Sequence, residues 1–180
     1  MPRYVALLRG INVGGNNIIK MSELKACFES LGFADVSTYI ASGNVLFSAK
    51  SSAAALGKKV EPALSKQFNY QASVVFRSQA QLSATVDEAP KGFGTEPKKY
   101  RYDAVFLKEP LTAKAALPQV PTAPGVDQVW AGDGVLYFSR LIARAAQSKL
   151  AKLIGTPVYK QVTIRNWNTT TALLRLMESA

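Results

Sequence analysis

The 180-residue sequence contains no histidine and only one cysteine. Without histidine, Ser-His-Asp triads, Cys-His dyads and imidazole metal ligands are excluded. One cysteine permits neither an intrachain disulfide nor a thiolate zinc site. Cys27 lies at helical spacing from Leu24, Phe28 and Leu31. We therefore interpret it as a buried, inert thiol rather than a nucleophile.

Acidic residues are scarce as well, with 12 Asp and Glu against 22 Lys and Arg. The few acids do not form the DxD, ExxE or paired-carboxylate spacings that are typical of metal sites and glycosidases. Asp87 and Glu88 fall at an expected helix end, Asp133 falls in a turn, and Asp127 lies near a strand start. We expect no metal ion, no cofactor and no catalytic residue of these classes.

Long hydrophobic runs are missing too. No apolar stretch approaches the roughly 20 residues that a membrane helix needs. The apolar run before Arg9 is also too short for the core of a signal peptide. We therefore expect no membrane association and a cytoplasmic location.

Positive charge is abundant, at a formal +10, and it is concentrated near one end of the sequence. Residues 134–177 contain seven Lys or Arg and no acid. A basic face attracts nucleic acid, nucleotides and other anions. The alternative interpretation is a solvated surface that keeps the protein in solution.

Hydrophobic patterning predicts the order βαββαβ in the first half of the chain. The expected strands cover residues 3–9, 36–41, 44–49 and 71–77. The expected helices cover residues 22–31 and 52–68, and Pro62 inside the second is expected to kink or shorten it. Gly32 ends the first helix. Ser78 and Gln81 form a capping box for a short third helix that reaches about residue 88.

The same order is predicted again after residue 99. Strands are expected at residues 100–108, 126–131, 134–139 and 159–165. Helices are expected at residues 112–117, from about 141 to 154, and from the end of the last strand to about 178. The stretch APKGFGTEPKK between the two halves is rich in Pro, Gly and Lys and is typical of a linker.

Matching residues occur at equivalent positions of the two halves. Tyr4-x-Ala-Leu-Leu corresponds to Tyr102-x-Ala-Val-Phe, and Val74-x-Phe-Arg corresponds to Val162-x-Ile-Arg. These matches indicate a duplication. The predicted fold class is α+β, with duplicated ferredoxin-like units, two antiparallel sheets and helices packed on them. We expect a first half at residues 1–89, a linker at 90–99 and a second half at 100–180, together forming one compact unit because each half alone is small.

Three stretches of the sequence are similar to a known family. They are YVALLRGINVGGNNIIKMSELK (4–25), TYIASGNVLFS (38–48) and TIRNWNTTTALLRLM (163–177), with SKL (148–150) before the last. These residues resemble domain-of-unknown-function family 1697, a group of mostly bacterial proteins. The resemblance implies paired ferredoxin-like subdomains. It implies no particular activity, cofactor or catalytic residue.

The glycine-rich stretch after the first strand is the first candidate site. Gly10, Gly14 and Gly15 precede a helix, an arrangement in which backbone amides can hold a phosphate. Further donors there are Arg9, Asn12, Asn16, Asn17 and, in the next turn, Ser42 and Asn44. The stretch is neither a Walker A loop nor a GxGxxG loop. The alternative is a strand-to-helix connection that needs positive φ at its glycines.

The second candidate is the RNWNT motif, which comprises Arg165, Asn166, Trp167, Asn168 and Thr169. We expect Asn168 to cap the last helix and Trp167 to pack against Ala172. Arg165 would then lie beside the positive end of a helix dipole, which is unfavourable unless an anion joins it. The partner is either a bound ligand or a carboxylate from another part of the chain.

The third candidate is the adjacent pair Ser148 and Lys149. No triad partner accompanies them, so we interpret Ser148 as a helix cap and Lys149 as an anion contact.

Three functions follow as hypotheses. The first is binding of an anionic ligand, a nucleotide or nucleic acid, at a basic pocket that combines the glycine-rich turn with the RNWNT motif. The second is an enzyme or sensor for a phosphorylated small metabolite, and the third is an interaction module without a ligand, which could form an oligomer. The RNP1 pattern of RNA-binding sheets is missing. We therefore interpret the strand aromatics as core residues between the two halves: Tyr39, Phe47, Trp130, Tyr137 and Phe138.

Overall fold

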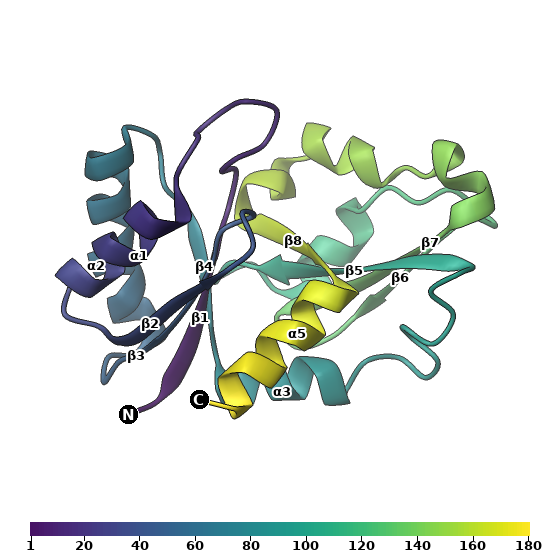
Figure 1. Cartoon of the computed structure of the whole chain (residues 1–180). Helices are drawn as coiled ribbons and strands as arrows, with labels where there is room; N and C mark the ends of the chain where they lie inside the picture. Colours follow the sequence, from purple (N-terminus) through teal and green to yellow (C-terminus); the bar gives the residue numbers. More distant parts are fainter. The chain divides into compact units, whose positions relative to one another are not determined.

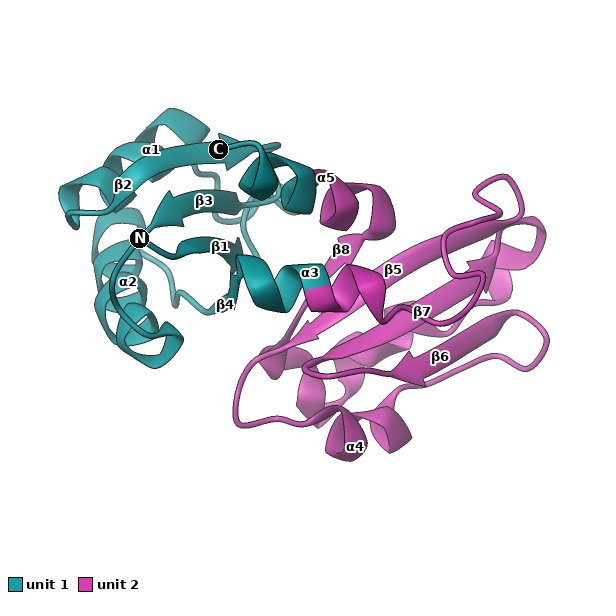
Figure 2. Cartoon of the chain, turned by 90° about the horizontal axis from the view of Figure 1, so that it is seen from below, with its two compact units in different colours: residues 1–83, 173–180 teal, residues 84–172 magenta.

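The computed structural model describes residues 1–180. The chain forms two compact units, coloured separately in Figure 2. Unit 1 contains Met1–Ser83 and Leu173–Ala180, and unit 2 contains Ala84–Ala172.

Unit 1 is built on a four-stranded antiparallel sheet with the order β2-β3-β1-β4. This order with the connection βαββαβ is the ferredoxin-like arrangement. Its elements are β1 (Arg3–Leu8), α1 (Met21–Ser30), β2 (Ala34–Tyr39), β3 (Asn44–Ser48), α2 (Ala53–Phe68) and β4 (Val74–Ser78). The predicted βαββαβ order is confirmed, with boundaries shifted by a few residues.

One face of this sheet is covered by α1 and α2 (Figure 1). Because side chains alternate along a strand, Ala6 and Leu8 of β1 point to this face. They pack in one cluster with Leu24 and Phe28 of α1 and with apolar residues of α2. Cys27 belongs to this cluster at 3% exposure, and burial raises the pKa of its thiol. The interpretation of Cys27 as a buried core residue is confirmed.

Gly32 and Ser52 lie at helix ends in unit 1, and of the two the sequence pattern predicted Gly32. Gly32 has a φ of +86° and follows α1, as a left-handed residue after a helix should. The Ser52 side chain caps α2 by accepting a bond from the Ala55 amide at 3.3 Å. Pro62 is exposed within α2, which continues past it to Phe68. Of the expected kink or shortening at Pro62, the shortening does not occur, because solvent can satisfy the carbonyl that loses its amide partner.

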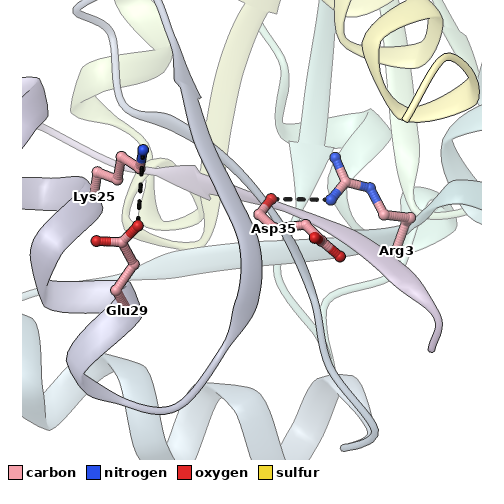
Figure 3. Close-up of polar contacts among 4 residues, drawn as sticks. All are labelled: Arg3, Lys25, Glu29 and Asp35. Atoms are coloured by element: carbon pink, nitrogen blue, oxygen red, sulfur yellow. Dashed lines mark hydrogen bonds and ion pairs between the residues drawn. The ribbon is translucent and has the colours of Figure 1, made fainter.

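Figure 3 shows two polar contacts at the periphery of unit 1, each between residues of that unit. Lys25 and Glu29 form an i,i+4 ion pair of 3.7 Å on the exposed side of α1. The Arg3 guanidinium donates to the Asp35 carbonyl at 3.0 Å, where β2 departs from regular pairing with β3. These side chains serve the fold of unit 1.

Between the two sheets along the chain lies α3 (Gln79–Asp87), which begins in unit 1 and ends in unit 2. The predicted capping box at its start is confirmed. The Ser78 amide donates to the Gln81 side chain at 2.9 Å, and the Gln81 amide donates to Ser78 Oγ at 3.2 Å.

Unit 2 repeats the topology, with the strand order β6-β7-β5-β8. Its strands are β5 (Tyr100–Leu107), β6 (Asp127–Ala131), β7 (Val135–Leu141) and β8 (Val162–Asn166). Its helices are α4 (Ala113–Ala116), the 3₁₀ segments η1 (Leu117–Gln119), η2 (Ile142–Gln147), η3 (Leu150–Gly155) and η4 (Pro157–Gln161), and α5 (Trp167–Glu178), which ends in unit 1. The predicted duplication is thus present in the fold.

The expected helix from about 141 to 154 is wrong. Leu141 still belongs to β7, and its amide donates to the Val126 carbonyl at 2.9 Å. The following residues form separate 3₁₀ turns, broken at Arg144, Ser148 and Thr156 by non-helical backbone. Alanine-rich sequence favours an α-helix here, but the tertiary bonds of this segment outweigh that weak preference.

Residues 90–99, expected as a linker, carry part of the core of unit 2. Phe93 is 9% exposed and contacts four other rings, with centroid distances of 4.8 to 6.0 Å. They belong to Tyr102, Trp130, Tyr137 and Trp167. The Tyr137 hydroxyl donates to the Thr85 carbonyl at 2.7 Å, and burial raises its pKa to about 12. Trp167 therefore packs on this aromatic cluster, where the sequence predicted a contact with Ala172.

Candidate functional site

The glycine-rich loop of unit 1 is fastened by Asn12. The Asn12 amide group donates to the carbonyls of Ile19 and Ala41, at 3.1 and 2.8 Å, and its Oδ1 accepts from the Ile19 amide at 2.8 Å. Its φ of +54° is one that asparagine tolerates. Asn12 therefore closes the loop and ties it to the turn between β2 and β3. The side-chain amide of Asn12 is therefore already used in hydrogen bonds within the protein.

Asn17 closes the same loop a second time. Its Nδ2 donates to the Gly10 carbonyl at 2.9 Å, and its carbonyl accepts from the Asn12 amide at 3.1 Å. Gly14 and Gly15 form the exposed tip, with φ of +58° and +78°, and their amides make no hydrogen bond within the protein. The loop thus has a structural base, and an exposed tip whose two amides face solvent. Asn16 is exposed beside them.

Ser42 belongs to the turn between β2 and β3, and Asn44 is the first residue of β3. Asn44 is fully buried, and its Nδ2 donates to the Tyr39 carbonyl at 2.9 Å and to Ser42 Oγ at 3.0 Å. The half-buried Arg9 lies at the end of β1, and its amide donates to the Ser73 carbonyl at 3.0 Å. Unit 1 therefore gathers its predicted residues around two neighbouring turns.

In unit 2, Arg165 is 7% exposed near the end of β8. Its Nη1 donates to Thr163 Oγ1 at 2.8 Å and to the Ile164 carbonyl at 2.9 Å. Burial lowers the pKa of the guanidinium to about 10. Arg77 near the end of β4 repeats this position, at 8% exposure, and donates to the carbonyl of the preceding residue at 2.9 Å. The buried arginine is thus a duplicated feature.

The cap of α5 is Asn166, which corrects the expectation for Asn168. Since α5 begins at Trp167, Asn166 is the residue before it, and its Oδ1 accepts from the Thr169 amide at 2.8 Å. Asn168 is exposed in the first turn, while Thr169 is buried.

Ser148 and Lys149 lie between η2 and η3, both half-buried. Ser148 Oγ accepts from the Leu150 amide at 3.3 Å, as a short-range cap does. The Lys149 amide donates to Asp127 Oδ2 at 2.8 Å, and the Ala123 amide donates to the same oxygen at 2.9 Å. Asp127 therefore fixes the backbone of Lys149 against the start of β6.

Three charged residues of unit 2 were not predicted as site residues. They are Asp103, Asp127 and Arg140, of which the two aspartates are 8% and 7% exposed. Asp103 Oδ2, Asp127 Oδ1 and Arg140 Nε are buried and make no hydrogen bond. Burial raises the pKa of the Asp103 carboxyl, against the opposing effect of Arg140 and Arg101. The sequence could have indicated Asp103, because it alternates with Val105 and Leu107 along one strand and so lies on the same, inward-facing side of it.

The predicted residues are divided between the two units. Unit 1 holds Arg9, the glycine-rich loop and the turn with Ser42 and Asn44; unit 2 holds the Ser148–Lys149 pair and the RNWNT motif. No group of three or more Cys, Asp or Glu is placed to hold a metal ion. None of the helices is both long and apolar enough to cross a bilayer.

Fold and sequence together define an α+β protein with two ferredoxin-like units and buried arginines at equivalent strand ends. The family described as "Protein of unknown function (DUF1697)" matches residues 1–137, and the chain belongs to that family. A similar solved structure is that of the conserved bacterial protein SP0830 from Streptococcus pneumoniae. It is 26% identical, with 98% of each chain covered and a TM-score of 0.83. The comparison with curated proteins gives no match.

Proposed function

We propose that the protein binds an anionic ligand, a nucleotide or a nucleic acid. The observation that carries this proposal is the acid-free basic run at residues 134–177. Within it, Arg144, Lys152 and Lys160 are exposed on the 3₁₀ segments of unit 2. Positive charge with no acid nearby in sequence raises the local concentration of anions and speeds their association.

The glycine-rich loop of unit 1 supports the same proposal independently. The amides of Gly14 and Gly15 are exposed and free of internal hydrogen bonds, and backbone amides of this kind are good anion donors. Lys20 is exposed just before α1, and no acid occurs between residue 1 and Glu23. The asparagines of the loop have a different role, because Asn12 and Asn17 hold its base together. We also propose a cytoplasmic setting, which suits a lone free cysteine.

The test is a fluorescence-anisotropy titration of a labelled single-stranded oligonucleotide at roughly 50 mM salt, a concentration at which such contacts are strong. The double variant Lys152→Ala with Lys160→Ala removes two exposed charges of unit 2, and we expect affinity to fall on the order of tenfold or more. Lys58→Ala with Lys66→Ala is the matched control, since it removes two exposed charges from α2. Equal losses in both variants would mean that the basic run has no special role.

A further inference from the structure

Asp103, Asp127 and Arg140 lie at one end of the sheet of unit 2. Strand β7 runs between β5 and β6 (Figure 2), and Arg140 is paired with Asp127 on one side and Arg101 on the other. Asp103 is paired with Phe138, two residues before Arg140 on the same strand. Because side chains two residues apart share a face, the three charged residues project from one face of the sheet. It is the face on which Val105, Leu136 and Phe138 form the core of unit 2.

These charged groups do not form an ion pair with one another. Neither aspartate is within ion-pair distance of Arg140, although Arg140 influences the titration of Asp103. Asp103 Oδ2 has no hydrogen-bond partner, and Asp127 uses one oxygen for the amides of Ala123 and Lys149 while the other has no partner. Buried polar groups without partners are unfavourable, and in native proteins they commonly mark a function or an unseen bound species.

The residues beside this group are held in place. The bond from the Lys149 amide to Asp127 fixes the junction of η2 and η3 next to the aspartate, with Ser148 before it. At the opposite edge, Asn166 of the RNWNT motif is paired with Asp103, and it caps α5. The predicted Ser148, Lys149 and Asn166 thus lie around the same end of one sheet, all within unit 2.

The side-chain chemistry of Asp103, Asp127 and Arg140 indicates the class of ligand that fits them. Carboxylate oxygens with free lone pairs accept hydrogen bonds from hydroxyl groups, as acidic residues do for the hydroxyls of ribose in dinucleotide sites. The Nε–H of Arg140 has no partner, and a guanidinium N–H donates readily to phosphate. A bound metal ion alone would satisfy the carboxylates but not Arg140.

We propose that this end of the unit 2 sheet binds a ribose phosphate group, with Asp103 and Asp127 accepting its hydroxyls and Arg140 contacting its phosphate. The proposal rests on the proposed function and names the ligand class for one of its sites. A free sugar phosphate and a nucleotide share this chemistry, and the experiment separates them.

The experiment is calorimetric titration of the full chain with ribose 5-phosphate, AMP and inorganic phosphate. The native protein should bind ribose 5-phosphate at least tenfold more tightly than inorganic phosphate. Tight binding of AMP as well identifies a nucleotide site, and binding of ribose 5-phosphate alone identifies a sugar phosphate site; either result supports the proposal.

Two variants sharpen the comparison. Asp103→Asn keeps the shape of the side chain, and it should remove the preference for ribose 5-phosphate while leaving inorganic phosphate binding unchanged. Arg140→Gln should weaken both ligands. Asp133→Asn, in an exposed turn, is the control and should behave like the native protein. Circular dichroism confirms that each variant is folded before it is titrated.

The proposal is overturned if the native protein binds ribose 5-phosphate no better than inorganic phosphate. It is also overturned if Asp103→Asn and Asp133→Asn give the same affinities. In either case, continued binding of the oligonucleotide would leave the proposed function standing. Loss of all anion binding would remove both.

Discussion

At the scale of single residues, the same side-chain types serve different purposes in this protein. Asn12 and Asn17 hold a loop together, Asn44 closes a turn and Asn166 caps a helix. The glycine-rich stretch at residues 9–17 contains three asparagines, three glycines and an arginine, which is also what a phosphate-binding loop would show. Only the hydrogen bonds distinguish a residue that holds the backbone from one that is available to a ligand.

Replacement of Asn12 tests this assignment. Asn12→Ala removes three hydrogen bonds and places alanine at a φ of +54°, which a β-carbon disfavours. We expect the free energy of unfolding to fall by about 2–4 kcal/mol, at about 1 kcal/mol for each bond plus the backbone cost. Urea denaturation measures it. Asn16→Ala is the control in the same loop, because its exposed side chain makes no hydrogen bond, and a similar loss there would argue against the assignment.

The carboxyl of Asp103 gives a prediction about pH. Its pKa in the folded protein is raised above the ordinary value of 3.8, chiefly by burial. The folded state therefore holds the proton more tightly than the unfolded chain does, so this group lowers stability as pH rises from about 3.8 through the folded pKa. Asp103→Asn removes the cost of keeping an ionised carboxylate buried. We expect the variant to be more stable than the native protein at neutral pH, by about 1–2 kcal/mol.

The pH at which this gain disappears is the informative quantity. Below the ordinary pKa the native carboxyl is protonated in both states, so urea denaturation should find little difference between the two proteins there. An advantage of the variant that is equally large in acid would show that shape, and not charge, is responsible. Asp133→Asn serves as the exposed control and should change stability at neither pH.

At the scale of elements, the local sequence determined most strands and the long helices. Periodic apolar residues predicted the order of strands and helices along the chain. Gly32 ends a helix and the Ser78–Gln81 box begins one where expected. The failures lie where distant residues decide the backbone. Residues 142–161 are broken into 3₁₀ turns, and the bond from the Lys149 amide to Asp127 cannot be read from local propensity.

The segment at residues 90–99 shows the same limit. Pro, Gly and Lys are typical of linkers, yet Phe93 is buried among aromatic rings that come from β5, β6, β7 and α5. Gly94 permits this packing, because a β-carbon there would lie 2.6 Å from two atoms of the Trp167 ring. The composition of the segment indicates flexibility, whereas its structure places it in the core of unit 2.

Two glycines of this segment allow the cost of packing against Trp167 to be measured separately from the cost of placing alanine at a positive φ. Gly94 and Gly92 both have positive φ, of +84° and +80°, but a β-carbon at Gly92 would meet nothing closer than 3.9 Å. Gly92→Ala should therefore cost about 1 kcal/mol, from the backbone alone. Gly94→Ala should cost about 1–3 kcal/mol more, through overpacking against Trp167. Thermal unfolding followed by tryptophan fluorescence tests this, and equal costs would contradict the packing described for Trp167.

At the scale of the whole molecule, the duplication organises the chain. Both units have the same strand order, and each has a buried arginine next to the last residue of its fourth strand. The charged groups, however, differ between the units. The Asp103, Asp127 and Arg140 group belongs to unit 2, where the acid-free run also begins. Duplication thus explains the shared fold of the two units. The proposed binding depends on charged residues that are present in unit 2 and have no counterpart in unit 1.

Affinity for a single-stranded oligonucleotide as a function of salt tests the central claim, anion binding through the basic run, most directly. For the native protein, log K should fall linearly with log salt, with a slope of about −0.7 for each phosphate neutralised. The slope should become shallower by about 1.4 when Lys152 and Lys160 are both replaced by alanine, and it should stay at the native value when Lys58 and Lys66 are replaced. Binding that is absent at low salt, or that does not change with salt, would contradict the account.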